Sequence, residues 1–519
     1  MNIGRLLSET AHHHPDHPGV RWGGSELSYR ELDDRVNALA AALSELGLTR
    51  GDRVGFIMWN RPELLEVLFA AFKLGLCVVP LNARFNSEEI VYHLGDPRAA
   101  VLVHGPEFRG DVERALTRTP TVRHVLSLDE ARPASATAQV HDYEQVVARH
   151  QGAGDATVDV DADDVCWLFY TSGTTGRPKG AMLTHGNLLF VALGWVADLM
   201  PLKPEDVTLH AAPLTHGAGF HALAAVAKGC TQVIPEKPAF DAQETLQLMA
   251  REGVTNTWLV PTQVNRLVQS PTLPDHDLSR LHSVLYGGAP FHAEDLKTAV
   301  ERLGPVLVQV YGQGETPMTA TYLRQDEHVL GDPDTEARLA SAGHARTGME
   351  VRLVDEDDQP VPTGELGEIV VRGPALMTGY WERPEESAHT LRGGWLHTGD
   401  IGKLDERGYL YVLDRLKDLI ITGGSNVYAR EVEEVLLQHP DVAAVSVIGV
   451  PDRNWGERVV AVVVPREGAE LGATTLVDHC GSHLASYKKP KQVHFVSKLP
   501  VSAYGKVLKR ELRDRYADA

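Results

Sequence analysis

Short apolar runs alternate with amphipathic helical patterns from about residue 26 to residue 323. Residues 26–50 place Leu32, Val36 and Leu43 on one face of a predicted helix, and residues 54–58 follow as an apolar run. Residues 63–74 carry a second helical pattern, while 77–80 and 100–103 are strand-like. Strands that alternate with helices indicate a layered α/β fold with a largely parallel sheet.

The pattern changes at two places further along the chain. Residues 343–411 contain short strands between turns, such as 349–353 and 368–371, which predicts a β-rich closing subdomain over about 343–414. Residues 430–519 repeat helix and strand on a smaller scale. We therefore expect a large N-terminal domain over 1–414 and a small, mobile α+β domain over 415–519. Residues 131–164 are weakly periodic and are interpreted as a surface connection.

Composition and charge exclude several classes of protein. The 519 residues are 43% hydrophobic and 23% charged, which is typical of a globular protein and excludes a disordered or collagen-like chain. The net charge of −20 disfavours a general nucleic-acid binder. From His483 onward, nine Lys/Arg face three Asp/Glu. This basic tail is either a solvated face or a surface that meets a phosphorylated ligand.

The sequence disfavours both a membrane span and a metal site built from cysteine or histidine. No apolar run approaches the roughly 18–20 residues of a membrane span, and the N-terminus lacks a signal-peptide pattern, so we expect a cytoplasmic protein without integral membrane association. Widely spaced cysteines indicate buried free thiols in a reducing compartment: Cys77, Cys166, Cys230 and Cys480. Solvated side chains are preferred over a metal site for the N-terminal histidines: His12, His13, His14 and His17.

The strongest chemical signal is a loop that follows the apolar run 165–169. Residues 170–180 read Tyr-Thr-Ser-Gly-Thr-Thr-Gly-Arg-Pro-Lys-Gly. Glycines let backbone N–H groups approach phosphate oxygens, hydroxyls donate hydrogen bonds, and lysine supplies positive charge. The spacing differs from that of a Walker A motif, which disfavours a P-loop NTPase. Polyphosphate binding is therefore favoured over an ordinary surface loop.

This loop resembles the phosphate-loop signature of the adenylate-forming superfamily. That group contains acyl-CoA synthetases, adenylation domains of peptide synthetases and firefly-type luciferases. Further signatures of the family occur in the expected order between about residues 25 and 512. The motifs are most similar to those of AMP-forming synthetases of the fatty-acid type. By this resemblance, the loop residues that bind ATP are Thr171, Ser172, Gly173, Thr174, Thr175, Gly176 and Lys179.

Two further segments resemble the family's nucleotide site. Residues 311–316 are similar to its Tyr-Gly-x-Thr-Glu segment, which implies that Tyr311 stacks on adenine and that Glu315 binds Mg²⁺ with Thr171 nearby. The chain departs from the pattern at Gly314, where the family usually has threonine. Residues 286–290 resemble the segment that lines the adenine and acyl pocket. The implied ATP/AMP contacts are Gly288, Ala289, Pro290, Tyr311, Gly312, Gln313, Gly314, Glu315 and Thr316.

The remaining signatures lie near and beyond the predicted domain boundary. Residues 397–400 resemble the family's Thr-Gly-Asp motif, which implies that Asp400 accepts hydrogen bonds from the ribose. Residues 414–418 resemble the hinge segment. Several roles follow from these resemblances: Arg415 would reach the ribose, Lys417 would be the pivot, Gly423 and Gly424 would line the CoA channel, and Lys506 would be the catalytic lysine of the C-terminal motif.

The acyl side is represented by residues 212–220. His216 occupies the family's histidine position, and Gly219 and Phe220 are the other expected pocket residues. No aspartate lies between Leu214 and Gly229 to pair with an α-ammonium group, and an unpaired buried ammonium would be costly. A simple acid is therefore favoured over an amino acid. The small residues here leave room for a fatty or bulky hydrophobic acid.

Together these residues predict an AMP-forming acid:CoA ligase that uses MgATP, CoA and a hydrophobic carboxylic acid, with a fatty acid as first choice. Its catalytic residues would be Lys506, Thr171, Glu315 and His216. Three alternatives stay open: an aromatic or alicyclic acid, a different acceptor such as an amine or a carrier-protein thiol, and a non-catalytic nucleotide-binding protein. A homodimer is also left open.

Overall fold

The computed structural model describes residues 1–129, 131–171, 177–291, 293–422, 425–453, 455–501 and 507–517, and only the backbone of Asp334 and Lys417. The chain divides into two compact units. The first contains Met1–Phe291, Lys297–Val351 and Val371–Leu396. The second consists mainly of Arg352–Val370 and His397–Ala519.

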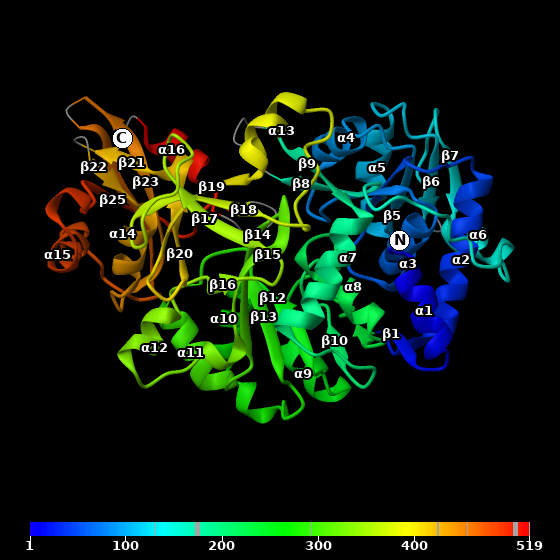
Figure 1. The fold of residues 1–519 in the computed structure, drawn as a ribbon, viewed down its shortest axis with the longest axis horizontal. Coiled ribbons are helices and arrows are strands. Elements are labelled where there is room, and N and C mark those ends of the chain that lie inside the picture. The colour runs from blue at the N-terminus through cyan, green and yellow to red at the C-terminus, as the bar shows by residue number, and fades with distance from the viewer. Residues whose placement is uncertain are drawn as a thin grey trace. The chain divides into compact units, whose positions relative to one another are not determined.

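A seven-stranded sheet forms one half of the first unit. Its order is β7-β6-β5-β3-β4-β8-β9, and all neighbours are parallel except β8 and β9, which are antiparallel. One face packs under α4 and α5 (Figure 1), whose apolar residues share a core with the strands. The strands are β3 (Arg53–Ile57), β4 (Cys77–Pro80), β5 (Val101–His104), β6 (His124–Ser127), β7 (Gln139–Asp142), β8 (Val165–Thr171) and β9 (Lys179–Thr184).

A nine-stranded sheet forms the other half, in the order β16-β15-β14-β13-β12-β10-β11-β1-β2. The inner strands from β14 to β1 are parallel, whereas β15, β16 and β2 pair antiparallel at the edges. The strands are β1 (Pro18–Trp22), β2 (Ser25–Ser28), β10 (Val207–Leu209), β11 (Thr231–Val233), β12 (Asn256–Leu259), β13 (Ser283–Gly287), β14 (Leu307–Gln313), β15 (Thr316–Leu323) and β16 (His344–Ala345).

Helices surround these sheets, and local signals set their ends. Ser28 and Glu31 form a capping box that starts α2, so the predicted helix over 26–50 begins only after β2. Helices α7 and α8 contact each other and β15 (Figure 1). The helices are α1 (Arg5–His13), α2 (Tyr29–Glu45), α3 (Pro62–Lys73), α4 (Ser87–Gly95), α5 (Arg109–Leu116), α6 (Tyr143–Arg149), α7 (His185–Gly194), α8 (Gly217–Ala227), α9 (Ala242–Glu252), α10 (Pro261–Val268), α11 (Ala293–Leu303), α12 (Pro333–Arg338) and α13 (Pro384–Thr390).

The second unit holds most of a four-stranded sheet and all of a five-stranded one. The first has the order β17-β18-β19-β20, and the second has β22-β21-β24-β23 with β25 beside β24. The strands are β17 (Glu350–Val354), β18 (Leu366–Arg372), β19 (Leu396–Leu404), β20 (Leu410–Arg415), β21 (Ile420–Thr422), β22 (Ser425–Val427), β23 (Val442–Asp452), β24 (Gly456–Pro465) and β25 (Gln492–Phe495). The helices are α14 (Ala429–Leu437), α15 (Ala473–His483) and α16 (Lys509–Tyr516).

The predicted α/β class is confirmed. The interpretation of residues 131–164 as a surface connection is wrong in part, because β7 and α6 lie within it. The compact units divide the predicted β-rich segment: residues 352–370 and 397–414 group with the C-terminal residues, whereas 343–351 and 371–396 belong to the first unit. The boundary between residues 414 and 415 stays a prediction.

Three sequence expectations concern the cysteines, membrane-spanning helices and metal binding. All four cysteines are buried free thiols, as predicted. Over the described ranges, every helix is too short or too polar to cross a membrane. In the same part of the chain, including the N-terminal histidines, no group of three or more His, Cys, Asp or Glu side chains is arranged to hold a metal ion.

Candidate active site

Parallel strands bring three of the predicted segments to one edge of the nine-stranded sheet. β10, β12, β13 and β14 are mutually parallel, so their carboxyl ends share that edge. His216 follows β10, Gly288 follows β13, and Tyr311 lies near the end of β14. The carboxyl edge of a parallel sheet is where α/β proteins usually bind ligands. The sheet topology therefore explains why residues so far apart in sequence serve one site.

A buried carboxylate marks the second feature of this region. Gly314 and Glu315 form the turn between β14 and β15, and Glu315 is only 7% exposed. The Thr171 hydroxyl donates to its Oε1 over 2.9 Å, and the Tyr380 hydroxyl donates to the same oxygen over 2.7 Å. The structure thus brings together Thr171 and Glu315, the two predicted metal ligands.

Tyr380 was missed by the sequence analysis. Its segment pairs with the edge of β9: Met182 N–H donates to Gly379 O (2.9 Å) and Trp381 N–H donates to Gly180 O (2.8 Å). Met377 N–H also donates to the carbonyl oxygen of Glu315 over 2.9 Å. The segment therefore holds the Glu315 turn by both backbone and side chain. Only its Gly-Tyr-Trp sequence, in a turn-rich stretch, could have drawn attention to it.

The end of the phosphate loop lies beside this tyrosine. Thr171 and Lys179 are paired residues at the ends of β8 and β9. Lys179 Nζ lies 5.2 Å from the centroid of the Tyr380 ring and 4.0 Å from the Glu386 carboxylate. Burial, and next the charge of Glu315, raise the pKa of Tyr380 well above its ordinary value. The phenol therefore stays protonated and can donate its hydrogen bond throughout the neutral range.

The glycine at position 314 has a steric cause. A Cβ atom there would lie 2.4 Å from Thr171 Cγ2 and 2.5 Å from Phe169 Cδ1, closer than side chains approach. The departure from the family's threonine is therefore linked to Phe169, which was not predicted as a site residue. Thr316, another predicted ATP contact, is fully buried and its hydroxyl is 2.8 Å from that of Thr319. Its contact with a phosphate stays a prediction.

The predicted adenine segment is open to solvent. Gly288, Ala289 and Pro290 are exposed, and residues 311–314, including Gly312 and Gln313, are half-buried. Gly287 and Val310 are paired in neighbouring strands, so the two segments are adjacent. Gly288 has φ of +76°, which favours glycine at this position. A flat base could thus lie against backbone here.

In the second unit, the predicted ribose residues form an ion pair. Asp400 and Arg415 are paired in β19 and β20, and Arg415 Nε lies 3.3 Å from Asp400 Oδ1. Glu368, which the sequence analysis missed, shapes the preceding turn: it accepts from Gly399 N–H over 2.9 Å and lies 2.9 Å from His397 Nδ1. The turn therefore presents Asp400 from a hydrogen-bonded frame.

The predicted hinge is tied to the last helix of the same unit. Leu416–Asp418 form a short 3₁₀ turn, and Asp418 pairs with Arg513 of α16 over 2.6 Å. Burial raises the pKa of Asp414, while the nearby Lys509 opposes that shift. Some predicted residues lie outside the described part of the chain: Ser172, Gly173, Thr174, Thr175, Gly176, Gly423, Gly424, Lys506 and the side chain of Lys417.

On the acyl side, His216 is half-buried at the start of α8, with Nδ1 3.1 Å from the Thr215 hydroxyl. Its ring meets that of Phe169 edge to face, with centroids 5.3 Å apart. Gly219 and Phe220 are buried, and Phe220 packs on Phe169 with centroids 5.7 Å apart. Phe169 and His216 are therefore half-buried aromatic residues on this side, and the buried Phe220 packs against Phe169.

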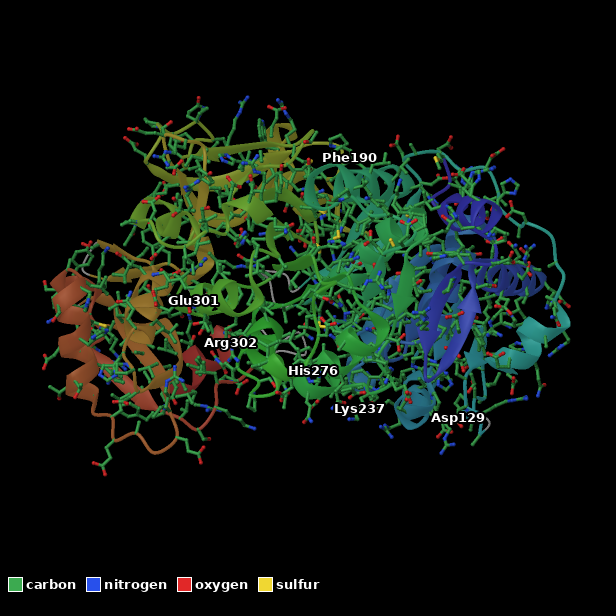
Figure 2. The ribbon with its side chains drawn as sticks, turned by 90° about the horizontal axis from the view of Figure 1, so that it is seen from below. Asp129, Phe190, Lys237, His276, Glu301 and Arg302 are labelled. Carbon is green, nitrogen blue, oxygen red and sulfur yellow. The ribbon has the colours of Figure 1, made fainter. Side chains whose placement is uncertain are left out.

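The residues present fit a magnesium ion. Both hydroxyl donors use Oε1 of Glu315, and no cationic side chain of the described residues pairs with this carboxylate. By contrast, the charged residues Lys237, Glu301 and Arg302, labelled in Figure 2, are exposed. A buried carboxylate with a second oxygen available is a hard ligand of the kind Mg²⁺ prefers, and Thr171 adds a hydroxyl oxygen.

Comparison with known proteins agrees with this geometry. Residues 7–381 match the family described as AMP-binding enzyme, and residues 431–506 match the AMP-binding enzyme C-terminal domain. A feruloyl-CoA synthase from an Amycolatopsis species is 40% identical, over 97% of this chain and 96% of that protein. A medium/long-chain-fatty-acid–CoA ligase from Mycobacterium tuberculosis is 35% identical, over 99% of this chain and 90% of its own.

A solved structure extends the comparison to the fold. That of an amide bond synthetase from Marinactinospora thermotolerans has 31% identity and a TM-score of 0.89, and the match covers 99% of this chain and 100% of that one. The chain belongs to the AMP-binding enzyme family, which is the adenylate-forming superfamily that its motifs predicted. Within it, the chain is an enzyme of the acyl-CoA synthetase class.

Proposed function

We propose that the protein is an AMP-forming ligase that joins a hydrophobic carboxylic acid bearing an aromatic ring to CoA. The observation that carries this proposal is the buried Glu315 carboxylate, which accepts hydroxyl hydrogen bonds from Thr171 and Tyr380 on one oxygen. Thr171 lies at the end of the phosphate loop, the half-buried Phe169 is two residues before it in β8, and the His216 ring meets that of Phe169.

The reaction needs two steps because a carboxylate is a poor electrophile. In the first, an oxygen of the acid attacks the α-phosphorus of ATP, the bond to pyrophosphate breaks, and an acyl-adenylate forms. In the second, the CoA thiol attacks the acyl carbon, loses its proton, and AMP leaves as the thioester forms. The barrier to the first step is the approach of two anions.

The chain's residues divide this work. Glu315 and Thr171 would hold Mg²⁺, which supplies positive charge to the phosphates when bound. Lys179 adds a fixed charge, and Lys506 would add another during adenylation only. The C-terminal domain would then turn about Lys417 and bring the loop at 423–424 to guide CoA, since the two steps need different groups at one centre. The basic tail would attract both phosphorylated substrates.

Two observations support an aromatic acid as the substrate. A feruloyl-CoA synthase is among the relatives at 40% identity, and the half-buried Phe169, two residues before Thr171, meets the aromatic ring of His216. A fatty acid is the second candidate. It is favoured by the fatty-acid ligase relative at 35% identity and by the small residues at the start of α8.

CoA is the preferred acceptor because both of these relatives are named for CoA. An amine is the competing acceptor, since the similar solved structure is of an amide bond synthetase. AMP release is measured with a panel of aromatic and straight-chain acids, with CoA, with amines, and with neither. The proposal expects acid-dependent release that requires CoA and is fastest with aromatic acids. Release that amines support as well as CoA would contradict it.

A further inference from the structure

The alternation of β8 separates its side chains into two sets. Leu168 and Tyr170 belong to the core beneath α4 and α5. Trp167, Phe169 and Thr171 therefore share the opposite face, since successive strand residues point to opposite sides. Trp167 is fully buried, whereas Phe169 and Thr171 are half-buried. On this face of β8, Phe169 therefore lies between the buried Trp167 and Thr171, whose hydroxyl donates to Glu315.

The Phe169 ring is fixed from several sides. Its centroid lies 5.7 Å from that of Phe220 in a stacked arrangement and 5.3 Å from that of His216 at an interplanar angle of 71°. It also rests against the backbone of Gly314, because a Cβ there would lie 2.5 Å from Cδ1 and 2.9 Å from Cε1. The absence of a side chain at position 314 leaves room for the Phe169 ring.

Position along the strand relates this ring to the chemistry. Thr171 is two residues further along β8, roughly 7 Å away. In the proposed reaction, the carboxylate of the acid lies beside Thr171 and Glu315. The carbon atoms attached to that carboxylate would then lie beside the Phe169 ring. A flat group there would meet the fixed aromatic walls of Phe169 and His216, and offset or edge-to-face ring contacts are favourable.

We propose that Phe169 is a specificity-determining residue, which selects acids whose carboxylate is joined directly or through a conjugated link to an aromatic ring. Gly314 supports this role by leaving the ring its space. The inference rests on the proposed function and deepens it. If Phe169 only filled the core, its side chain would be as buried as that of Trp167. Instead, Phe169 is half-buried and lies near the C-terminal end of β8.

The test uses acid-dependent exchange of pyrophosphate into ATP by the full chain, with 3-phenylpropenoic acid and the straight-chain nonanoic acid as probes of equal carbon number. Phe169→Leu keeps an apolar side chain but removes the aromatic face. We expect kcat/KM for the aromatic acid to fall about 10-fold or more, within the range of a lost ring contact plus buried surface. For nonanoic acid, and for the KM of ATP, the change should stay below about 3-fold.

Two further variants separate specificity from structure. Phe169→Tyr keeps the ring and should retain the wild-type preference between the acids. Phe190→Leu is the matched control, because Phe190 is a half-buried phenylalanine of α7 (Figure 2) that packs near Gly348. It should leave the preference unchanged. Equal losses for both acids in Phe169→Leu, or no loss for either, would overturn the proposal.

The dependence on Gly314 gives an independent check. Gly314→Ala should lower exchange with both acids, and the loss should be smaller when Phe169 is already alanine, because two of the three close contacts of the new Cβ are with Phe169. Additive losses would contradict the coupling. A wild-type enzyme that activates only straight-chain acids would overturn this inference and the choice of an aromatic acid, but would leave the proposed AMP-forming ligase reaction in place. One that activates no acid would overturn the proposed function as well.

Discussion

Two buried carboxylates are predicted to contact the nucleotide, and the chain surrounds them differently. Glu315 in the first unit receives two neutral hydroxyl donors on one oxygen. Asp400 in the second unit pairs with the guanidinium of Arg415 at 3.3 Å. Hydroxyl donors leave a carboxylate its full charge, which suits a site that receives a cation. An ion pair is already neutralised, and it suits hydrogen bonds to sugar hydroxyls.

The largest effect should come from Glu315→Gln. The amide keeps the shape and one acceptor but removes the charge, so we expect pyrophosphate exchange to fall about 1000-fold, and raising Mg²⁺ should restore little of it. Glu327→Gln is the control, because Glu327 is also buried but serves as a cap for Arg324 N–H. Comparable losses in both variants would show that Glu315 matters only as a buried carboxylate, and would contradict its role as a magnesium ligand.

Asp400→Asn should have a smaller and different effect. Losing a charged hydrogen-bond acceptor should raise the KM of ATP roughly 10- to 100-fold with the Mg²⁺ dependence unchanged. The comparison is sharpened with 2′-deoxy-ATP and 3′-deoxy-ATP, which should be weaker substrates for the wild type but bind the variant about as well as ATP. An unchanged preference for ATP in Asp400→Asn would place the ribose elsewhere.

The two units should also differ in acid sensitivity. Burial lowers the pKa of His185, His210 and His328 in the first unit to about 4. Between pH 6.5 and 4 these histidines bind protons when unfolded but not when folded, so their contribution to stability is lost as pH falls. Each should cost the first unit roughly 2 kcal/mol between pH 7 and pH 5.

In the second unit, burial raises the pKa of Asp414, so its folded form holds a proton more readily and gains stability as pH falls. Hydrogen exchange followed by mass spectrometry at pH 7 and pH 5, corrected for intrinsic rates, reads the two units separately. Protection should fall more in the first unit. Equal loss in both would contradict the assignment of neutral buried histidines.

The smallest effect is expected for Tyr380→Phe. Only one of two hydrogen bonds to Glu315 is removed and the charge remains, so exchange should fall about 10-fold with a raised Mg²⁺ requirement. Because the pKa of Tyr380 is raised, the wild-type rate should show no loss from tyrosine ionisation below about pH 10. Tyr322→Phe, at a half-buried tyrosine of β15, is the control. A rate unchanged by Tyr380→Phe would show that Thr171 alone suffices.

Sequence patterns predicted the sheets well because burial imposes a strict period. The apolar runs at 54–58 and 77–80 became the neighbouring strands β3 and β4, as their flanking helices required. The stretch 131–164 was misread because β7 is the edge strand of its sheet and none of its four residues is fully buried, so its apolar signal is weak.

The candidate site was predictable only where a motif named its residues. Thr171 and Glu315 were predicted to be close, and their side chains meet. Tyr380 lies 65 residues from Glu315 and was missed, because its hydrogen bond depends on how two distant segments pack. Phe169 was hidden for another reason: an aromatic residue in an apolar strand looks like core until the tertiary structure shows it half-buried above Gly314.

The most direct measurement follows the two steps of the wild-type enzyme separately by mass spectrometry. With MgATP and an aromatic acid but no CoA, the proposal predicts an acyl-adenylate and one equivalent of pyrophosphate. Addition of CoA should convert that intermediate to the thioester and AMP in a single turnover. Thioester formed without a detectable adenylate, or ATP cleaved to ADP and phosphate, would contradict the account.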